Sequence, residues 1–280
     1  MTPKARKQFA QHWLRSETTL NQIVAAAQLH KNEGAKGSAK GDRILEIGPG
    51  TGILTRRLLP EVESVAAVEI DRDLCELLVK TFRSAENFLL LQGDFLTLDL
   101  ETQLASFPKF QNPNKVVANI PYNITGPILE KLLGTITQPA ADPFDLIVLL
   151  VQKEVAERLY ANPGSRAFGA LSVRVQYLAE SELICHVPAK AFSPPPKVDS
   201  AVVRLRPRQM EPKAVDPKQL ETLVKLGFSS KRKMLRNNLK SLVECDFLTQ
   251  LLEQLDVNPQ ARAEDLSVQQ WVALANELHR

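Results

Sequence analysis

The tetrapeptide Asn-Ile-Pro-Tyr at residues 119–122 places a side-chain amide and an aromatic ring on either side of a proline. It follows the apolar run KVVA, which we interpret as a buried strand. Pro121 has no N–H to continue strand pairing, and the residue before a proline is held extended. We therefore expect Asn119, Ile120 and Tyr122 to be fixed on a stiff turn at the carboxyl end of a strand, where open α/β sheets bind ligands. A strand that simply ends in a turn explains the tetrapeptide equally well.

A glycine-rich turn, LEIGPGTG, carries Gly48, Gly50 and Gly52 directly after an earlier strand and before a helix. Glycines allow the backbone to approach a ligand closely, and the amino end of a helix favours negative charge. The spacing is G-x-G-x-G and differs from the G-x-G-x-x-G of dinucleotide-binding proteins. Tight turns between a strand and a helix also use glycine without any ligand.

Two carboxylates end the next two strands. Glu69 lies 21 residues after Gly48, where a nucleotide-binding α/β sheet places the acid that accepts hydrogen bonds from ribose hydroxyls. Asp71 is expected to cap the helix that follows. Asp94 ends the run FLLLQGD, and its carboxylate can accept a hydrogen bond from an adenine amino group. Each acid alone is more simply a turn residue, but the series of three strand ends predicts an adenosine-containing cofactor.

Short apolar strands alternate with helices through most of the chain, which predicts a largely parallel sheet covered on both faces. We expect strands at 43–48, 64–71, 88–94, 115–120 and 144–151, and later, antiparallel ones at 183–188 and 200–207. We expect helices at 17–32, 52–60, 72–82, 126–134, 153–161 and 170–180. A proline-rich linker at 206–217 precedes an all-helical remainder, so we predict a catalytic domain at 1–207 and a helical domain at 208–280.

Composition excludes several classes of protein. Of the 280 residues, 44% are hydrophobic and 24% charged, as in ordinary globular proteins. The longest apolar run, LIVLLV at 146–151, is too short to span a membrane. The cysteines are far apart and odd in number, which indicates a reducing compartment, and neither they nor the four histidines have metal-site spacing. We therefore expect no membrane association and no metal.

Basic residues gather where acids are absent. The net charge is only +3, but residues 228–241 hold five basic residues and no acid. Within this stretch Arg232, Arg236 and Lys240 recur every four residues beside Leu235, Leu239 and Leu242, as on an amphipathic helix. Such a stripe can bind phosphates or can simply be a solvated face. If the stripe binds a nucleic acid, the predicted contacts are Lys231, Arg232, Lys233, Arg236 and Lys240.

These segments together resemble the Rossmann-like fold of S-adenosylmethionine-dependent methyltransferases. LEIGPGTGILT is similar to its glycine motif, VEID to its ribose acid, GDF to its adenine acid, and NIPY to the (N/D)-P-P-Y motif of enzymes that methylate exocyclic amino groups of nucleobases. QHWL, LVQKEVAERL, AFSPPPKVDSAVVRLRP and FSSKRKMLRNNL resemble segments of the KsgA/RsmA ribosomal RNA adenine dimethyltransferases. The resemblance runs from about residue 8 to the end, and FSPPPKVDSAV is its most specific part.

The resemblance implies S-adenosylmethionine as cofactor and particular roles for the matching residues. The implied cofactor contacts are His12, Leu14, Gly48, Gly50, Glu69, Asp94 and Asn119. The implied catalytic residues are Asn119, Ile120, Pro121, Tyr122 and Phe192. Three features depart from the family: His12 replaces a common Asn, Ile120 replaces the first proline of the motif, and the 32–42 loop is long and receives no role.

The chemistry of an adenine N6 nitrogen explains why such a corner suits this reaction. Its lone pair is delocalised into the ring, so carbonyl oxygens of Asn119 and Ile120 that accept the N6–H bonds would favour a tetrahedral, nucleophilic nitrogen. Pro121 preorganises both acceptors. Tyr122 offers a flat face on which the base can stack, and such stacking contributes roughly 1–3 kcal/mol to binding. The resemblance implies that Phe192 covers the other face of the base. Without the resemblance, packing in the core is the simpler interpretation of Phe192. No general base is required.

The resemblance implies methylation of two adjacent adenosines in the 3′-terminal hairpin of small-subunit ribosomal RNA, within a precursor of the small subunit. We expect a cytoplasmic monomer. One alternative is a large-subunit rRNA adenine methylase of the antibiotic-resistance type. Another is a mainly non-catalytic RNA-binding assembly factor, although the intact NIPY, glycine and acid motifs disfavour it. A DNA adenine methylase and a nicotinamide dehydrogenase are disfavoured, the latter by the glycine spacing.

Overall fold

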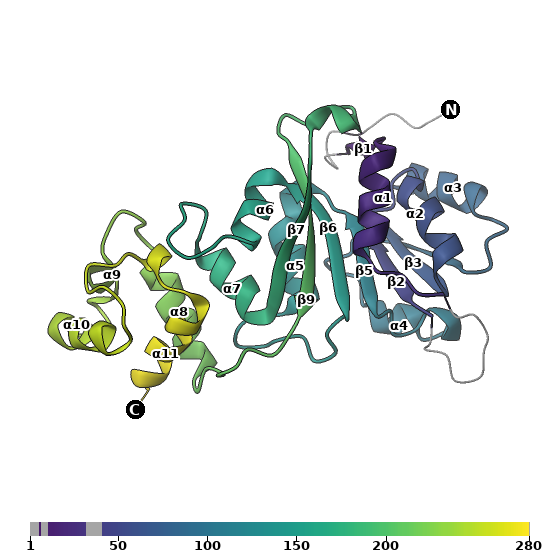
Figure 1. The fold of residues 1–280 in the computed structure, drawn as a ribbon. Helices are drawn as coiled ribbons and strands as arrows, with labels where there is room; N and C mark the ends of the chain where they lie inside the picture. Colours follow the sequence, from purple (N-terminus) through teal and green to yellow (C-terminus); the bar gives the residue numbers. More distant parts are fainter. Residues whose placement is uncertain (1–5, 7–10, 32–40, 280) are drawn as a thin grey trace. The chain divides into compact units, whose positions relative to one another are not determined.

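The computed structural model describes residues 6, 11–31 and 41–279 (Figure 1). These residues form two compact units. The first comprises the segments up to Leu132, Asp142–Ala156 and Glu182–Pro207, and the second comprises Leu133–Ala141, Glu157–Ser181 and the chain from Arg208 onward. The second unit therefore contains more than the predicted 208–280 domain, and the predicted division at residue 207 stays a proposal. Most of the 32–42 loop lies outside the described residues.

A seven-stranded sheet forms the centre of the first unit, with strand order β4-β3-β2-β5-β6-β9-β7. Its strands are β2 (Arg43–Ile47), β3 (Ser64–Glu69), β4 (Phe88–Gln92), β5 (Lys115–Asn119), β6 (Leu146–Gln152), β7 (Ala179–Val187) and β9 (Ser200–Pro207). The pairs from β4 to β6 are parallel, and β9 runs antiparallel to β6. The predicted mostly parallel α/β sheet with a late antiparallel strand is confirmed.

Both faces of this sheet are buried, as a parallel sheet requires. Ile44, Val65 and Val117 belong to one core cluster, which also contains apolar side chains of α1 and α2. Their strand neighbours Leu45 and Val116 point to the opposite face because side chains alternate along a strand, and they too are fully buried. The near-continuous apolar strands of the sequence thus reflect packing on two sides.

The six helices with predicted bounds are present, and all but the first begin and end within two residues of those bounds. The helices of the described residues are α1 (Glu17–Ala26), α2 (Ile53–Leu58), α3 (Arg72–Thr81), α4 (Leu100–Leu104), α5 (Thr125–Leu133), α6 (Lys153–Leu159), α7 (Ala170–Leu178), α8 (Pro217–Gly227), α9 (Leu235–Leu239), α10 (Cys245–Gln254) and α11 (Val268–Glu277). The predicted capping role of Asp71 is confirmed, since its side chain accepts a hydrogen bond from Asp73 N at the start of α3. The α1 helix ends earlier than the expected residue 32.

A second, two-stranded sheet joins segments that are far apart in the sequence. The strand β1 (Trp13–Leu14) pairs antiparallel with β8 (Phe192–Ser193), so that Trp13 lies opposite Ser193 and Leu14 opposite Phe192. The N–H of Arg15 extends the pairing by donating to the Ala191 carbonyl at 2.8 Å. This small sheet fixes the QHWL segment against the FSPPP segment.

The helices of the second unit pack around Trp271, which is fully buried. The Phe228 ring lies 5.7 Å from the Trp271 ring, and a Cβ at Gly227 would come within 2.4 Å of Trp271 Cη2. Close packing therefore requires glycine at the end of α8. Among the described residues, no helix is long and apolar enough to cross a membrane, and no group of His, Cys, Asp or Glu side chains could hold a metal.

The structure corrects the prediction that the basic residues lie on one continuous helix. Only Leu235–Leu239 is helical, so Arg232 lies in the turn before α9 and Lys240 at its end, and the three basic residues do not share one continuous helix. Leu235 and Leu239 are buried as expected, but Leu242 is 51% exposed because it lies beyond the helix.

One carboxyl group lies inside the core of the first unit. Glu46 of β2 accepts a hydrogen bond from Thr55 Oγ1 of α2 at 2.7 Å. Burial, followed by the nearby charge of Glu69, raises the pKa of Glu46 to about 8, against the hydrogen bond from Thr55, which lowers it. The carboxyl group is therefore protonated in the folded protein at neutral pH, where it would be ionised in the unfolded chain.

We expect the folded state to lose stability as the pH rises through this window. The folded protein holds a proton on Glu46 that the unfolded chain releases near pH 4.5, so the contribution is complete below pH 4.5 and lost by about pH 8. Glu46→Gln removes this slope, which amounts to at most about 1.4 kcal/mol per pH unit. In urea unfolding from pH 5 to 9, the free energy of unfolding of Glu46→Gln should rise relative to that of the wild type as the pH increases. The control Glu76→Gln, on the exposed face of α3, should show no such change. Identical pH profiles for Glu46→Gln and the wild type would contradict this account.

Candidate active site

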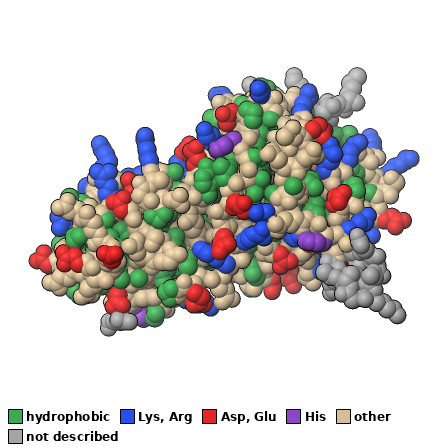
Figure 2. Space-filling model, in the orientation of Figure 1, with side chains coloured by type: hydrophobic (Ala, Val, Ile, Leu, Met, Phe, Trp, Pro, Cys, Tyr) green, Lys and Arg blue, Asp and Glu red, His purple; other side chains and the backbone are tan. Residues whose placement is uncertain are grey.

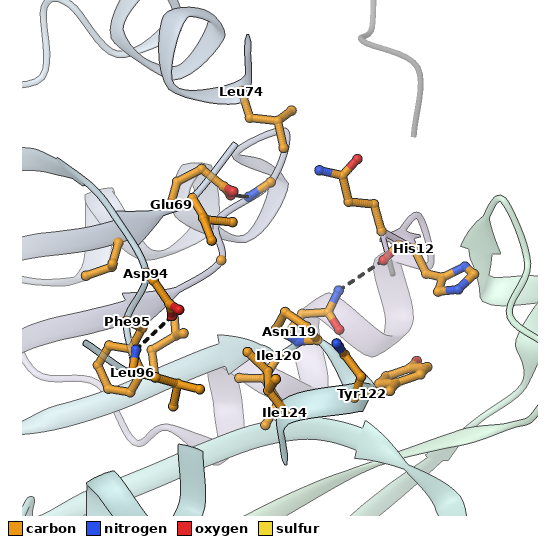
Figure 3. Close-up of a pocket in the computed structure, with 18 of the residues that line it drawn as sticks. His12, Glu69, Leu74, Asp94, Phe95, Leu96, Asn119, Ile120, Tyr122 and Ile124 are labelled. Carbon is orange, nitrogen blue, oxygen red and sulfur yellow. Dashed lines mark hydrogen bonds between the residues drawn. The ribbon is translucent and has the colours of Figure 1, made fainter. Parts of the chain in front are cut away.

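A cavity of about 340 Å³ opens at the carboxyl ends of β2, β3, β4 and β5 (Figure 3). Its volume lies in the range of small-molecule sites. Figure 3 shows Glu69 and Asp94 on one side of the cavity and His12, Asn119 and Tyr122 on the other. The structure thus brings together the glycine turn, the two acids and the NIPY tetrapeptide, as their strand-end positions predict.

The glycine turn lies directly against the NIPY corner. Gly48 and Gly50 have φ angles of +66° and +59°, which side chains rarely adopt. A Cβ at Gly48 would lie 3.9 Å from both the Asn119 carbonyl oxygen and Pro121 Cδ. A Cβ at Gly50 would come within 3.3 Å of Trp13 Cδ1. Glycine is therefore needed at both positions, for the backbone conformation and for the close approach of Trp13.

Two backbone N–H groups hold the Glu69 carboxyl group at the wall of the cavity. Oε2 accepts from Gly50 N at 3.1 Å, and Oε1 accepts from Asp71 N at 2.9 Å. Burial raises the pKa of Glu69, and these backbone hydrogen bonds act in the opposite direction. The carboxyl group is thus oriented before any ligand binds, and its lone pairs can accept further hydrogen bonds from hydroxyl groups.

The loop after β4 lies on the same side of the cavity as Glu69. Asp94 Oδ1 accepts from Leu96 N at 2.9 Å, which fixes its carboxylate at the start of the loop. Lys131 of α5 donates to the carbonyl groups of Phe95 at 2.6 Å and Leu98 at 2.7 Å, and its ammonium lies 4.9 Å from the Phe95 ring centre. Desolvation lowers the pKa of Lys131, while Asp94 and Asp99 raise it. Lys131 therefore holds in place a loop whose residues line the cavity.

The NIPY corner has its amide oriented by a specific contact. Asn119 Nδ2 donates to the His12 carbonyl at 3.3 Å, which directs the amide nitrogen toward His12 and leaves Oδ1 as the acceptor end (Figure 3). Ile120, which is 1% exposed, anchors the corner in the core. Pro121, with φ −59°, follows the last residue of β5 by two positions and ends the strand pairing. The contact with His12, the buried side chain of Ile120 and the fixed φ angle of Pro121 thus order the corner before a substrate binds.

Tyr122 lies in the cavity wall and is only half-buried. Its hydroxyl forms a 2.6 Å hydrogen bond with Oγ of Ser200, a fully buried residue at the start of β9. Burial raises the pKa of the Tyr122 hydroxyl above its usual value, so the group stays neutral near pH 7. Tyr122 is thus a fixed, uncharged ring.

The segment from Gln11 to Trp13 lines the same cavity, and its polar contacts tie it to the first unit. Gln11 Nε2 donates to Asp71 Oδ2 at 2.9 Å, and His12 Nδ1 donates to the Pro194 carbonyl at 2.8 Å. The buried Trp13 Nε1 finds no acceptor among the described residues. A buried N–H without a partner is costly, so Trp13 is a further candidate for ligand contact.

Two groups of predicted site residues lie outside this cavity. Leu14 and Phe192 do not line this cavity; both pack in the hydrophobic core, where Phe192 is 4% exposed. The roles proposed for Leu14 and Phe192 therefore stay predictions. The basic residues at 231–240 belong to the second unit. Sequence reasoning missed Gln11, Trp13, Lys131 and Ser200, and only the indole N–H in QHWL offered a chemical signal.

Comparison with known proteins gives a consistent result. Residues 2–280 match the family described as ribosomal RNA adenine dimethylase. A protein of Nostoc punctiforme named ribosomal RNA small subunit methyltransferase A is 72% identical over 275 residues, covering 98% of this chain and 95% of the relative. A protein of the same name from Nostoc sp. is also 72% identical, with 98% of both chains covered.

Two solved structures share the fold over nearly the whole chain. A dimethyladenosine transferase from Plasmodium falciparum has a TM-score of 0.76 at 28% identity, covering 96% of this chain and 98% of that one. The 23S rRNA methyltransferase ErmE has a TM-score of 0.72 at 27% identity, covering 96% of this chain and 100% of that one.

The Tyr122–Ser200 hydrogen bond can be measured by a double-mutant cycle. We expect Tyr122→Phe and Ser200→Ala each to lower the free energy of unfolding by about 0.5–1.5 kcal/mol, because each removes one partner of a largely buried pair. The double variant should be little worse than either single one, since the same interaction is lost. Strictly additive effects in urea unfolding would show that the two groups do not interact in solution.

Proposed function

The chain belongs to the ribosomal RNA adenine dimethylase family, and from this premise we propose that it methylates N6 of two adjacent adenosines in the 3′-terminal hairpin of small-subunit ribosomal RNA. It is an S-adenosylmethionine-dependent adenine dimethyltransferase of ribosomal RNA. The observation that carries the proposal is the cavity in which the NIPY corner faces the glycine turn and two strand-end acids.

The residues present fit the cofactor. Gly48 and Gly50 bring backbone without a side chain to the cavity wall, Glu69 is oriented to accept from ribose hydroxyls, and Asp94 can accept from an adenine amino group. The unpartnered Trp13 Nε1 lies at the same wall. When bound, S-adenosylmethionine supplies a methyl group carried on a sulfonium sulfur.

The chain's own residues prepare the nucleophile. Because the Asn119 amide nitrogen is engaged by the His12 carbonyl, Oδ1 is the end available to accept from an adenine N6–H. The Ile120 backbone carbonyl is the second acceptor, and Pro121 fixes the backbone between them. Two fixed acceptors favour a tetrahedral nitrogen without the cost of ordering them during turnover.

Tyr122 supplies the stacking surface, since its ring is held through Ser200 and its hydroxyl remains neutral. The nitrogen becomes acidic once it is alkylated, so no side chain has to remove a proton beforehand. A target adenine in a hairpin must leave its stack to reach the cavity, at a cost of a few kcal/mol that stacking on Tyr122 offsets in part.

The RNA and its context form the finer part of the proposal. Lys231, Arg232, Lys233 and Lys240 are exposed and Arg236 is half-buried, and no ion pair joins any of the five to another described residue. Figure 2 shows Lys and Arg side chains projecting around the turn that leads into α9. We propose that these residues contact RNA phosphates, that the substrate is a precursor of the small ribosomal subunit, and that the protein acts as a cytoplasmic monomer.

The large-subunit alternative is disfavoured. The likeness to ErmE, at 27% identity, is compatible with a common fold and a common reaction. The relatives at 72% identity are named for the small subunit. The test is transfer of labelled methyl groups to unmodified small subunits, large subunits and naked rRNA, followed by mapping of the modified base. Label on two adjacent adenosines of small-subunit rRNA supports the proposal, and label confined to large subunits contradicts it.

We expect Asn119→Ala to reduce the rate of methyl transfer at least about 100-fold, as loss of a fixed polar contact to the reacting group does in other enzymes. RNA binding should persist, because phosphate contacts lie elsewhere. Single-turnover transfer to small subunits measures the rate, and Asn162→Ala, at an exposed loop position, serves as control. Unchanged turnover in Asn119→Ala would remove the proposed role of the amide.

The basic residues near α9 should contribute to RNA affinity through counterion release. Arg232→Gln is expected to weaken RNA binding and to reduce the slope of log affinity against log salt by about one. Filter binding from 50 to 300 mM salt measures both. Arg83→Gln, an exposed residue after α3, provides the matched change of charge. Equal slopes for the wild type and Arg232→Gln would exclude Arg232 as a phosphate contact.

A further inference from the structure

We propose that Lys131 of α5 is a positioning residue for the cofactor. By holding the turn that follows β4, it sets how tightly and how selectively the cavity binds the adenine end of S-adenosylmethionine. This inference rests on the proposed function, because it takes Asp94 as the acceptor for the adenine amino group. The observation that carries it is the contact of one ammonium group with the carbonyl oxygens of Phe95, Leu96 and Leu98 in this turn.

The N–H groups of the turn after β4 are held by Asp94. The Asp94 carboxylate accepts from Leu96 N at 2.9 Å (Figure 3). The Asp94 backbone carbonyl accepts from Thr97 N at 3.1 Å and from Leu98 N at 2.9 Å. The orientation of the carboxylate toward the cavity therefore depends on this single turn keeping its shape.

The carbonyl groups of the same turn are held by Lys131. The last carbonyl groups of a helical turn have no partner within the turn and need one from elsewhere. Lys131 Nζ donates to the Phe95 carbonyl at 2.6 Å and to the Leu98 carbonyl at 2.7 Å. A longer contact of 3.3 Å reaches the Leu96 carbonyl. These contacts account for the three N–H donors of an ammonium group, so Lys131 fixes one side of the turn and Asp94 the other.

The ammonium of Lys131 also acts on the groups that face the cofactor. It lies 4.9 Å from the centre of the Phe95 ring, which is buried and lines the cavity. Desolvation lowers the pKa of Lys131, and the charges of Asp94 and Asp99 raise it. The ammonium therefore attracts the Asp94 carboxylate as well as the carbonyl groups of the turn.

Lys131 joins this turn to a helix that starts at the NIPY corner. The α5 helix begins at Thr125, whose Oγ1 donates to the Tyr122 carbonyl at 3.2 Å. Lys131 lies 36 residues after Phe95 and 33 residues after Leu98. The loop at the cofactor end of the cavity is thus fixed to a regular element from a distant part of the sequence.

The consequence for the ligand is selectivity for an amino group. A carboxylate held in one orientation accepts a hydrogen bond from the adenine amino group. A purine with a carbonyl oxygen in place of that amino group offers no donor there and brings two acceptors together, so a site built for the donor rejects it. Without Lys131 the turn and the Asp94 carboxylate lose their fixed position, and this preference should decrease. A residue that served only the stability of the fold would affect both ligands alike.

The experiment measures the dissociation constants of S-adenosylhomocysteine and S-inosylhomocysteine by competition calorimetry. S-inosylhomocysteine carries a carbonyl oxygen in place of the adenine amino group. In Lys131→Met, which removes the ammonium from a side chain of similar length, we expect the constant for S-adenosylhomocysteine to rise about tenfold and that for S-inosylhomocysteine by less than about threefold. Lys131→Arg keeps the charge and the donors, so it should retain most of the wild-type preference.

Methyl transfer to unmethylated small ribosomal subunits should show the same origin of the defect. In Lys131→Met the KM for S-adenosylmethionine should rise about tenfold, whereas kcat at saturating cofactor and the KM for subunits should stay near the wild-type values. The matched control is Lys80→Met, at an exposed position in the last turn of α3, which should equal the wild type in every measurement.

Two results would overturn the inference. One is wild-type affinity for both ligands in Lys131→Met, and the other is a weakening of both ligands by the same factor. Each differs from failure of the proposed function, in which the wild type itself transfers no methyl group to small-subunit adenosines. Circular dichroism and unfolding midpoints without ligand establish that the variants are folded. Lys131→Gln, which also removes the charge, is measured by the same criteria if Lys131→Met does not fold.

Discussion

The site depends on the contact between the proline-braced corner after β5 and the glycine turn after β2. Pro121 ends strand pairing, so the chain must turn within two residues of Asn119. The glycine turn lies against this corner, and the φ of +66° at Gly48 favours glycine there. Because β2 and β5 are neighbours and parallel, this contact joins the corner proposed to bind the nucleophile to the turn proposed to bind the cofactor. Under the proposed function, the order of strands in the sheet places the two substrates side by side.

Rigidity around that contact comes from polar interactions that are complete before a ligand arrives. Glu69 is held by two backbone N–H groups, Tyr122 by Ser200, and the Asn119 amide by the His12 carbonyl. Preorganised polar groups are effective because they need no reordering when charge or geometry changes at the reacting atom. Under the proposed function, the protein contributes mainly by positioning, which agrees with a reaction that requires no side chain to act as a base.

Much of the first unit could be predicted because its signals are local. Apolar runs identified the parallel strands, and the ends of those strands located Gly48, Glu69, Asp94 and Asn119 in one cavity. The two-residue strands β1 and β8 have no periodicity, and the Tyr122–Ser200 contact spans 78 residues, so neither leaves a local trace. The prediction that the basic residues share one helix was wrong. Their four-residue spacing continues through a turn, where no helix aligns the side chains.

The most direct measurement of the central claim is a crystal structure of the protein with S-adenosylhomocysteine and an adenosine-containing fragment of the target hairpin. The account predicts the adenine over the Tyr122 ring, with N6 within hydrogen-bonding distance of Asn119 Oδ1 and the Ile120 carbonyl. It also predicts the cofactor ribose at Glu69. An adenine bound away from this corner, or one that faces the Asn119 amide nitrogen, would contradict it.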